Sequence, residues 1–586
     1  MRASLILRVE KPGQPFNIVM FMNLTIKAKE QNTYDAIVVG SGISGGWAAK
    51  ELCERGLKTL VLERGRNVEH IKDYPTAFNH PWEFSHHLNN TEKDKAEDPI
   101  QSTTYDEGNK HFYISDKDHP YIQDDPFRWI RGYQVGGRSL TWGRQCYRLS
   151  DLDFEANAKE GIAVDWPIRY KDIEPWYAYV EKFIGLSGRS ENLSHLPDGH
   201  FLPPIEMNCL EDYFATEIAK NFPDRIVTPA RMANLTQSHN GRGPCQYRNL
   251  CSRGCPFGAY FSSNAATLPA AKLTGNMTLR PFSIVQEVMY DKELKRAVGV
   301  RVIDMNTKEA TEYYGKIIFL NASTIATASI LLNSVSTEFP TGLGNSSGQV
   351  GHNLMDHFIG TGAEGEFDGF HDKYYSGRTP GSLYIPRFRN INPATAQKEF
   401  TRGYGFQGRA FRENWQDKMS STEGFGENFK DSLTTPGKWK IWIGAWGETL
   451  PYYDNQVTLD SERDKWGIPL VRVSFKYHEN EEAMKRDIQT SAEAMLQKTG
   501  FKNIHGFSYD VPGGSAVHEM GTARMGRDPK TSVLNAFNQL HDVKNVFITD
   551  GSCMTSSATQ NPSLTYMALT ARACEFAAEE LKKGNL

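Results

Sequence analysis

The chain has 586 residues, of which 23% are charged and 39% hydrophobic, and its formal net charge is −4. This length allows about two to four domains with a large core, and the composition is that of an ordinary globular protein. The weakly acidic balance gives no reason to expect nucleic acid or an anionic membrane as a partner.

The N-terminal segment is predicted to be a tail. No apolar run in the chain approaches the ~18 residues that cross a bilayer. Residues 16–22 form a short apolar patch, but no small-residue cleavage site follows it, so it is a poor signal peptide. A translation start at Met22 explains the patch equally well. We therefore expect residues 1–33 to be a disordered tail, with no export signal and no membrane insertion by this chain.

The next segment predicts a strand–helix–strand unit. Residues 34–39 are a β-branched run typical of a buried strand, and residues 47–55 predict a helix that stops at Gly56. Residues 58–62 predict a second strand, which ends at Glu63.

A G-x-G-x-x-G loop connects the first strand to the helix. Gly40 permits the tight turn, Gly42 lets the backbone approach a pyrophosphate, and Gly45 lets the helix pack on the strand. Glu63 has the spacing of the acid that binds ribose hydroxyls, which disfavours NADP. The unit therefore predicts dinucleotide binding and leaves FAD and NAD open.

Two further junctions are rich in small residues. The turn at residues 136–143 would let the backbone lie along a flat ring, although a plain surface turn has the same composition. Residues 316–320 predict a buried strand, and residues 324–334 predict a helix after the small residues 321–323. This second strand-to-helix junction points to the same cofactor.

The remaining middle of the chain is less regular. Residues 74–127 and 367–438 are polar and aromatic without a clear helical or strand period, and long segments of this kind are often lids. Residues 439–446 alternate and predict a strand that could form the floor of a pocket.

Three of the eight cysteines lie close together, as Cys245, Cys251 and Cys255. The C-x3-C-P ending also closes bacterial ferredoxin motifs, and three thiolates without a fourth would suit a [3Fe-4S] cluster. A zinc site with His239, or inert thiols or a disulfide, are the alternatives.

The C-terminal part holds a histidine in a Gly-rich loop and two further turns. His518 begins the loop, Asp550-Gly551 forms a turn, and Asn561-Pro562 opens a predicted helix that runs to Lys582. A neutral histidine suits a general base, because its ordinary pKa of ~6.5 is near working pH. The apolar face of the helix is predicted at Leu564, Met567, Ala568, Ala571, Cys574, Ala578 and Leu581.

With these motifs in this order, the chain resembles the glucose–methanol–choline (GMC) oxidoreductases from Tyr34 to the C-terminus. The resemblance implies an α/β FAD-binding Rossmann-like domain, of the p-hydroxybenzoate-hydroxylase-like GMC fold, with an α+β substrate domain on an antiparallel sheet. The implied FAD-binding segments are residues 34–150, 240–340 and 515–586. Residues 151–239 and 341–514 would form the substrate domain.

The same resemblance assigns roles to single residues. It makes His518 the base and Asn561 its hydrogen-bonding partner at the substrate hydroxyl. The turn near Thr141 has no histidine, so the FAD is expected to be non-covalent. The residues expected to bind FAD are Gly40, Gly42, Gly45, Glu63, Arg64, Gly137, Ser139, Val285, Ala322, Asp550, Gly551, Asn561 and Pro562.

The segment from Cys245 to Cys255 is similar to that of bacterial flavoprotein subunits of the glucoside 3-dehydrogenase and gluconate 2-dehydrogenase type. This likeness implies a small partner subunit, which could carry the missing export signal, a cytochrome c acceptor and a periplasmic location. The expected reaction is oxidation of a secondary hydroxyl of a sugar or glycoside to a ketone. An oxidase that releases hydrogen peroxide, a redox-silent lyase and an NAD-binding protein without chemistry are the alternatives.

Overall fold

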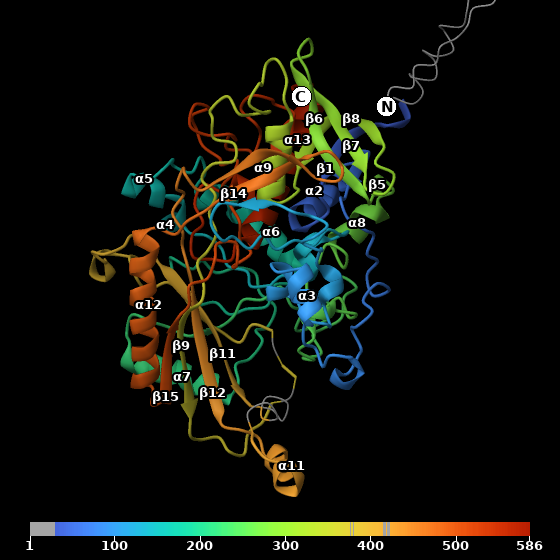
Figure 1. Cartoon of the computed structure of the whole chain (residues 1–586). Helices are drawn as coiled ribbons and strands as arrows, with labels where there is room; N and C mark the ends of the chain where they lie inside the picture. The colour runs from blue at the N-terminus through green and yellow to red at the C-terminus, as the bar shows by residue number, and fades with distance from the viewer. Residues whose placement is uncertain (1–29, 376, 379, 414–417, 419–421) are drawn as a thin grey trace, which may run out of the picture.

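The computed structural model describes residues 30–375, 377–378, 380–413, 418 and 422–586 (Figure 1). The predicted tail lies outside the described residues up to residue 29, and the first strand already begins at Thr33. None of the helices in the described part combines the length and the apolar character needed to span a bilayer.

The first sheet has the strand order β5-β2-β1-β8-β7-β6, and β16 also pairs with β8. Strands β5, β2, β1, β8 and β16 pair in parallel, and β7 and β6 extend the sheet in antiparallel fashion. The bounds are β1 Thr33–Val39, β2 Thr59–Leu62, β5 Met277–Arg280, β6 Ser283–Asp291, β7 Arg296–Asp304, β8 Ala310–Leu320 and β16 Val546–Ile548.

Helices cover this sheet because its central strands are apolar on both faces. The last four residues of β1 are all buried, as expected for a parallel strand between two helical layers. Helix α2 packs against α8 and α13, and α13 packs against α6. The helices of this part are α2 Ile43–Glu54, α6 Tyr170–Ile184, α8 Thr267–Leu273, α9 Thr324–Asn333 and α13 Ser563–Lys582.

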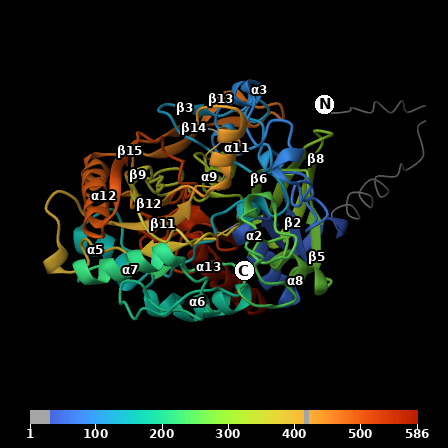
Figure 2. The same ribbon diagram turned by 90° about the horizontal axis from the view of Figure 1, so that it is seen from below.

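A second, antiparallel sheet lies at the other end of the molecule (Figures 1 and 2). Its order is β15-β9-β12-β11-β10-β4, and α12 and α7 pack on it. The bounds are β4 Thr228–Pro229, β9 Thr361–Phe367, β10 Leu383–Ile385, β11 Tyr404–Arg412, β12 Trp439–Gly447, β15 Lys502–Ser508, α7 Cys209–Asn221 and α12 Glu479–Lys498.

A small third sheet, in the order β13-β14-β3, lies beside α9. Its bounds are β3 Ile122–Gln123, β13 Gln456–Arg463 and β14 Pro469–Ser474. The remaining helices of the described part are short: α3 Glu92–Glu97, α4 Asp151–Phe154, α5 Ala156–Glu160 and α11 Gly426–Thr434.

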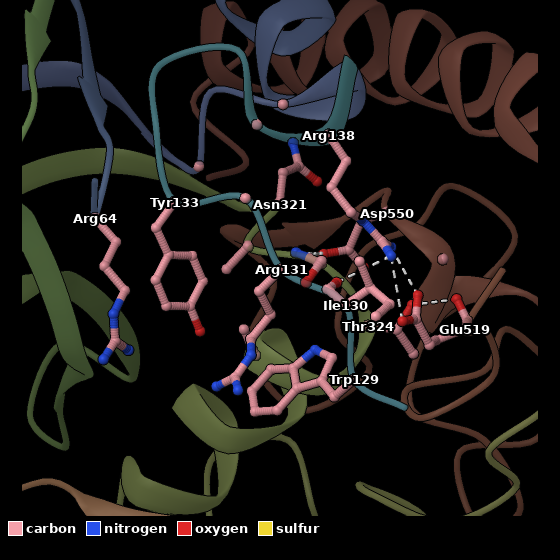
Figure 3. A pocket seen from close by; sticks show the side chains of 18 of the residues that line it. Arg64, Trp129, Ile130, Arg131, Tyr133, Arg138, Asn321, Thr324, Glu519 and Asp550 are labelled. Carbon is pink, nitrogen blue, oxygen red and sulfur yellow. Dashed lines mark hydrogen bonds and ion pairs between the residues drawn. The ribbon is translucent and has the colours of Figure 1, made fainter. Parts of the chain in front are cut away.

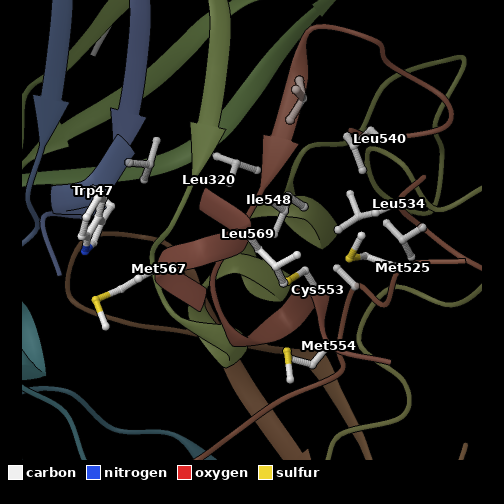
Figure 4. Close-up of a cluster of buried hydrophobic side chains, with 14 of the residues drawn as sticks. Trp47, Leu320, Met525, Leu534, Leu540, Ile548, Cys553, Met554, Met567 and Leu569 are labelled. Atoms are coloured by element: carbon white, nitrogen blue, oxygen red, sulfur yellow. The ribbon is translucent and has the colours of Figure 1, made fainter. Parts of the chain in front are cut away.

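The main core joins the two ends of the chain (Figure 4). Trp47 of α2, Leu320 of β8, Ile548 of β16 and Leu569 of α13 are all buried in one cluster. An apolar side chain of this size contributes about 1.5–3 kcal/mol when it is fully buried. The C-terminal helix is therefore an integral part of the N-terminal strand–helix–strand unit.

Most of the predicted elements are confirmed, but two expectations are wrong. Residues 367–438 are not wholly irregular, because β10 and β11 belong to the antiparallel sheet. Gly405 and Gly408 interrupt the apolar alternation of β11, so the sequence pattern did not predict a strand there. The apolar face of β12 packs in the core with α12 rather than against a pocket.

Candidate active site

Segments from both ends of the chain line one cavity (Figure 3). It lies beyond the carboxyl ends of the parallel strands, where open α/β sheets bind ligands. The predicted residues that line it are Gly40, Gly42, Glu63, Arg64, Gly137, Ser139, Val285, Ala322, His518, Asp550, Gly551, Asn561 and Pro562. Gly45 is predicted to bind the cofactor but does not line the cavity.

The turn between β1 and α2 has the shape of a phosphate cradle. Gly40 has a φ of 91°, and a Cβ on Gly45 would lie 1.9 Å from the carbonyl oxygen of Gly40. Gly45 is therefore required for packing inside the protein. Beside Gly42, by contrast, a Cβ would meet no atom within 4 Å. The open space next to Gly42 lies at the positive end of α2, where a phosphate is stabilised.

Glu63 ends β2 at the edge of the cavity. Its carboxylate accepts hydrogen bonds from the Ser41 hydroxyl at 2.6 Å and from the Gly65 amide at 2.9 Å. Burial raises the pKa of Glu63. Since a carboxylate has about four acceptor positions, it can still accept hydrogen bonds from ribose hydroxyls.

Arg64 lies in an aromatic corner of the same cavity. Its guanidinium is 4.7 Å from the ring centre of Tyr133 and 5.2 Å from that of Trp466, and it lies 3.6 Å from Asp464. Flat rings and a planar cation offer stacking surfaces for a ligand ring.

Two predicted flavin contacts use their side chains inside the protein. The Asp550 carboxylate accepts hydrogen bonds from the Ser323 amide at 3.0 Å and the Thr327 hydroxyl at 2.6 Å. The Ser139 hydroxyl donates to the Gly136 carbonyl at 2.5 Å and accepts from the Ser263 amide at 3.0 Å. Because these side chains are bonded to neighbouring loops, a flavin in the cavity would contact mainly the backbone of the loops.

Buried polar atoms test whether a large polar cofactor fits. Nδ2 of Asn321, Nε of Arg64 and the Tyr566 hydroxyl are buried in residues that line the cavity, and none has a hydrogen-bond partner among the described residues. A buried polar group without a partner costs about 1–3 kcal/mol. FAD carries phosphate, ribose and ring acceptors and donors, so the donor set and the glycine cradle fit this cofactor.

His518 is half-buried and held from three directions. Its Nε2 lies 3.4 Å from Nδ2 of Asn561, and its Nδ1 lies 2.8 Å from Nδ1 of His357. Its backbone amide donates to Asp356 at 3.0 Å. Burial, the His357 ring and the Arg138 charge hold the pKa of His518 well below its usual range.

The backbone at His518 is strained. Val517 has a φ of 56°, which is rare for a β-branched residue. Such a conformation costs of order 1–3 kcal/mol and persists only where the surroundings impose it. The two Asp356 hydrogen bonds, to the amides of Ala516 and His518, are part of that support.

An ion pair stands next to the histidine. Arg138 donates to Glu519 at 2.7 Å, and Figure 3 shows the two side chains facing each other in the cavity. Burial disfavours the charged guanidinium, but the Glu519 carboxylate outweighs burial and raises the pKa of Arg138. The guanidinium of Arg138 therefore stays charged beside a neutral histidine.

Asn561 connects the site to the antiparallel sheet. Its Oδ1 accepts a hydrogen bond from Nε2 of Gln407 at 2.8 Å, and Gln407 lies on β11. Sequence reasoning missed Gln407, His357, Arg138 and Asn321. The adjacent titratable residues Asp356 and His357 are the signal that could have indicated one of them.

The three clustered cysteines lie outside the cavity lining. Cys245, Cys251 and Cys255 are half-buried free thiols, and burial raises the pKa of Cys245. Within the described ranges, no group of three or more His, Cys, Asp or Glu is arranged to hold a metal ion. His239 instead contacts the Lys182 carbonyl at 2.7 Å. The thiols as they stand do not fit the predicted [3Fe-4S] cluster or the zinc alternative.

Two family models described as GMC oxidoreductase match the chain, one over residues 34–359 and one over residues 451–570. The chain belongs to the GMC oxidoreductase family. It is 28% identical over 566 residues to 2-methyl-1,2-propanediol dehydrogenase of Mycolicibacterium austroafricanum, covering 92% of this chain and 94% of that protein. It is 25% identical over 580 residues to the fructose dehydrogenase large subunit of Gluconobacter japonicus, covering 95% and 100%.

The fold has solved counterparts. The crystal structure of pyridoxine 4-oxidase from Mesorbium loti matches with a TM-score of 0.59 at 15% identity, covering 93% of this chain and 99% of that one. The predicted family, fold class and FAD oxidoreductase activity on alcohol groups are confirmed. The domain boundaries and the roles of single residues stay predictions.

The open space beside Gly42 leads to a testable prediction. Gly42→Ala should leave the unfolding temperature of the deflavinated protein unchanged, because the new methyl group meets no protein atom. FAD should bind about 10–100-fold more weakly, the equivalent of roughly 1–3 kcal/mol of steric cost. Fluorescence titration with FAD and thermal unfolding measure the two effects.

Gly45→Ala is the matched comparison. Its methyl group would overlap the Gly40 carbonyl, so this variant should unfold at a lower temperature even without FAD. Unchanged FAD affinity in Gly42→Ala would contradict the assignment of this turn as the phosphate-binding cradle.

Proposed function

We propose that the protein uses FAD to oxidise a secondary hydroxyl of a sugar or a related polyol to a ketone. The observation that carries the proposal is the His518–Asn561 pair. The Nε2 atom of His518 and the Nδ2 atom of Asn561 lie 3.4 Å apart, and both residues line the cavity that also contains the glycine cradle. FAD, when bound, supplies the acceptor for the hydride and its two electrons.

His518 takes the hydroxyl proton. Burial, the His357 ring and the Arg138 charge lower its pKa, so the imidazole is neutral and has a lone pair for the proton. Asn561 donates through Nδ2 and can hold the substrate oxygen beside that lone pair. Together they position the hydroxyl and remove its proton while the carbon loses its hydride.

The polar wall of the cavity supports a substrate with several hydroxyls. Arg144 and Gln145 line the cavity near Trp142, whose ring offers an apolar face. Gln145 also donates to Gln407 at 2.7 Å. The two relatives are named for a diol and for fructose, which agrees with a polyol or sugar substrate.

Electrons then leave to an external acceptor. The relative from Gluconobacter is named a large subunit, which supports a partner subunit for this chain as well. We propose that a small partner carries the export signal, and that the complex passes its electrons to a cytochrome c in the periplasm.

Removal of the base tests the assignment. His518→Ala should slow anaerobic flavin reduction by about 10²–10⁴-fold, the usual contribution of a general base. FAD content should stay the same. Stopped-flow absorbance at the flavin band measures the rate, with the sugar or diol that reduces the wild-type protein fastest.

The control for this variant is His371→Ala. The His371 side chain is 77% exposed and lies on the loop after β9, so its removal should leave the rate unchanged. Equal rates in His518→Ala and the wild type would rule out His518 as the base.

The pH profile gives a second test. The unprotonated form of His518 is active and its pKa is depressed, so kcat/KM should stay level as the pH falls through 6.5 and decline only below it. Asp356 titrates nearby, because burial and Glu519 raise its pKa to about 7. The profile is therefore recorded in Asp356→Asn as well. A midpoint at or above 6.5 that persists in Asp356→Asn would contradict the low pKa of His518.

Turnover in air tests whether oxygen is the electron acceptor. We expect slow hydrogen peroxide formation without an added acceptor and fast turnover with an artificial electron acceptor. Fast peroxide formation would make the protein an oxidase. Iron analysis of the same preparation decides the cluster hypothesis: about three irons per chain would support it, and iron-free protein would exclude Cys245, Cys251 and Cys255 from the electron route.

A further inference from the structure

A continuous chain of polar contacts passes through the candidate base. It starts at a backbone carbonyl, that of Ala558, which lies 2.8 Å from Nε2 of His357. His357 is fully buried, and its other nitrogen faces His518 at 2.8 Å. Beyond His518 the contacts continue through Asn561 to Gln407, Gln145 and the Tyr147 hydroxyl.

The carbonyl at the start fixes the direction of the hydrogen bonds. A carbonyl oxygen can only accept, so Nε2 of His357 must carry the proton that it donates to Ala558. In a neutral imidazole the other nitrogen, Nδ1, is then an acceptor. The facing Nδ1 of His518 must therefore carry a proton, since two lone pairs at 2.8 Å would repel each other. This leaves Nε2 of His518 without a proton.

We propose that His357 is a positioning residue that keeps His518 in the Nδ1–H tautomer and so turns the unprotonated Nε2 toward the substrate hydroxyl. The inference rests on the proposed function, in which His518 is the base. His357 touches neither the cavity nor a reacting atom, and it acts only through the ring of His518.

The far end of the chain agrees with this direction. The Tyr147 hydroxyl donates to Oε1 of Gln145, which directs Nε2 of Gln145 toward Oε1 of Gln407. Nε2 of Gln407 then donates to Oδ1 of Asn561. Asn561 is left with its Nδ2 donor facing His518, which matches an unprotonated Nε2 there. The amide orientations at this end therefore agree with the proton pattern that the Ala558 carbonyl imposes.

The surroundings keep His357 in one protonation state. Ala558 has a φ of 57°, a left-handed conformation that is uncommon for alanine, and its carbonyl meets Nε2 of His357 in this conformation. Burial lowers the pKa of His357 to about 4, so the ring is neutral at physiological pH. A second proton on His357 would also place two N–H groups against each other at the His518 contact.

Two substitutions at His357 separate its two hydrogen bonds. His357→Asn places an amide oxygen near the position of Nδ1, where it can accept from His518. His357→Gln reaches the position of Nε2 and the Ala558 carbonyl, but has no polar atom at the Nδ1 position. Both variants replace the imidazole ring by a side chain that ends in an amide, so each serves as the other's control for the lost packing of the ring.

The first readout is the protonation of His518 itself. In holoprotein labelled with 15N-histidine, we expect the proton of His518 on Nδ1 in the wild type and in His357→Asn, and a mixture of tautomers in His357→Gln. The His518→Ala variant identifies the resonances. A proton on Nε2 of His518 in the wild type would overturn the inference, whatever the protein oxidises.

The second readout is the rate of anaerobic flavin reduction by the sugar or diol that bleaches the wild type fastest. We expect His357→Gln to be about 10–100-fold slower at unchanged FAD content, an effect of the size seen when a metal-ligating histidine loses its outer hydrogen bond. His357→Asn should recover most of that loss. Equal rates in His357→Gln and the wild type would overturn the inference while leaving His518 as the base, whereas a wild-type flavin that no alcohol reduces would count against the proposed function instead.

Discussion

The site depends on the register at the end of β8. Leu320 pairs with Val39 of β1 on one side and with Ile548 of β16 on the other, so three strands from distant parts of the chain end at one level. The loops that follow them begin at Gly40, Asn321 and Thr549, and all three reach the same edge of the sheet. A slip of one residue in either ladder would turn every side chain of that strand to the opposite face of the sheet.

Short polar contacts then lock these loops together. Asn321 accepts hydrogen bonds from both the amide and the hydroxyl of Thr549, and Asp550 binds the amide of Ser323. The Ser263 hydroxyl donates to the Gly42 carbonyl and joins the cradle to the segment before α8. Because the loops are bonded to one another, the cavity is formed before any ligand arrives, which lowers the cost of ordering it.

The parts of the site that the sequence predicted are local in the chain. The glycine loop, Glu63 and the Asn-Pro start of α13 each follow from the spacing of neighbouring residues, and the structure brings them to one cavity. His357 and Gln407 could not be found in this way. They reach His518 and Asn561 across 161 and 154 residues of sequence, and only the folded chain brings them into contact.

Helix α13 shows the same limit in its packing. Its predicted apolar face is buried apart from Leu581, but Leu569, Ala573 and Ala577 are buried as well. The periodicity of one helix indicates which face is most apolar. It does not reveal that α2 and the strands β8 and β16 enclose the helix from further sides.

The central claim is that an alcohol gives its hydride to FAD while the chain takes the hydroxyl proton. The most direct measurement is the absorbance spectrum of the purified protein, kept free of oxygen, before and after addition of sugars and diols that include D-fructose and 2-methyl-1,2-propanediol. We predict flavin bands that lose their intensity with at least one of these alcohols. A colourless protein, or flavin bands that stay oxidised with every alcohol tested, would contradict the account.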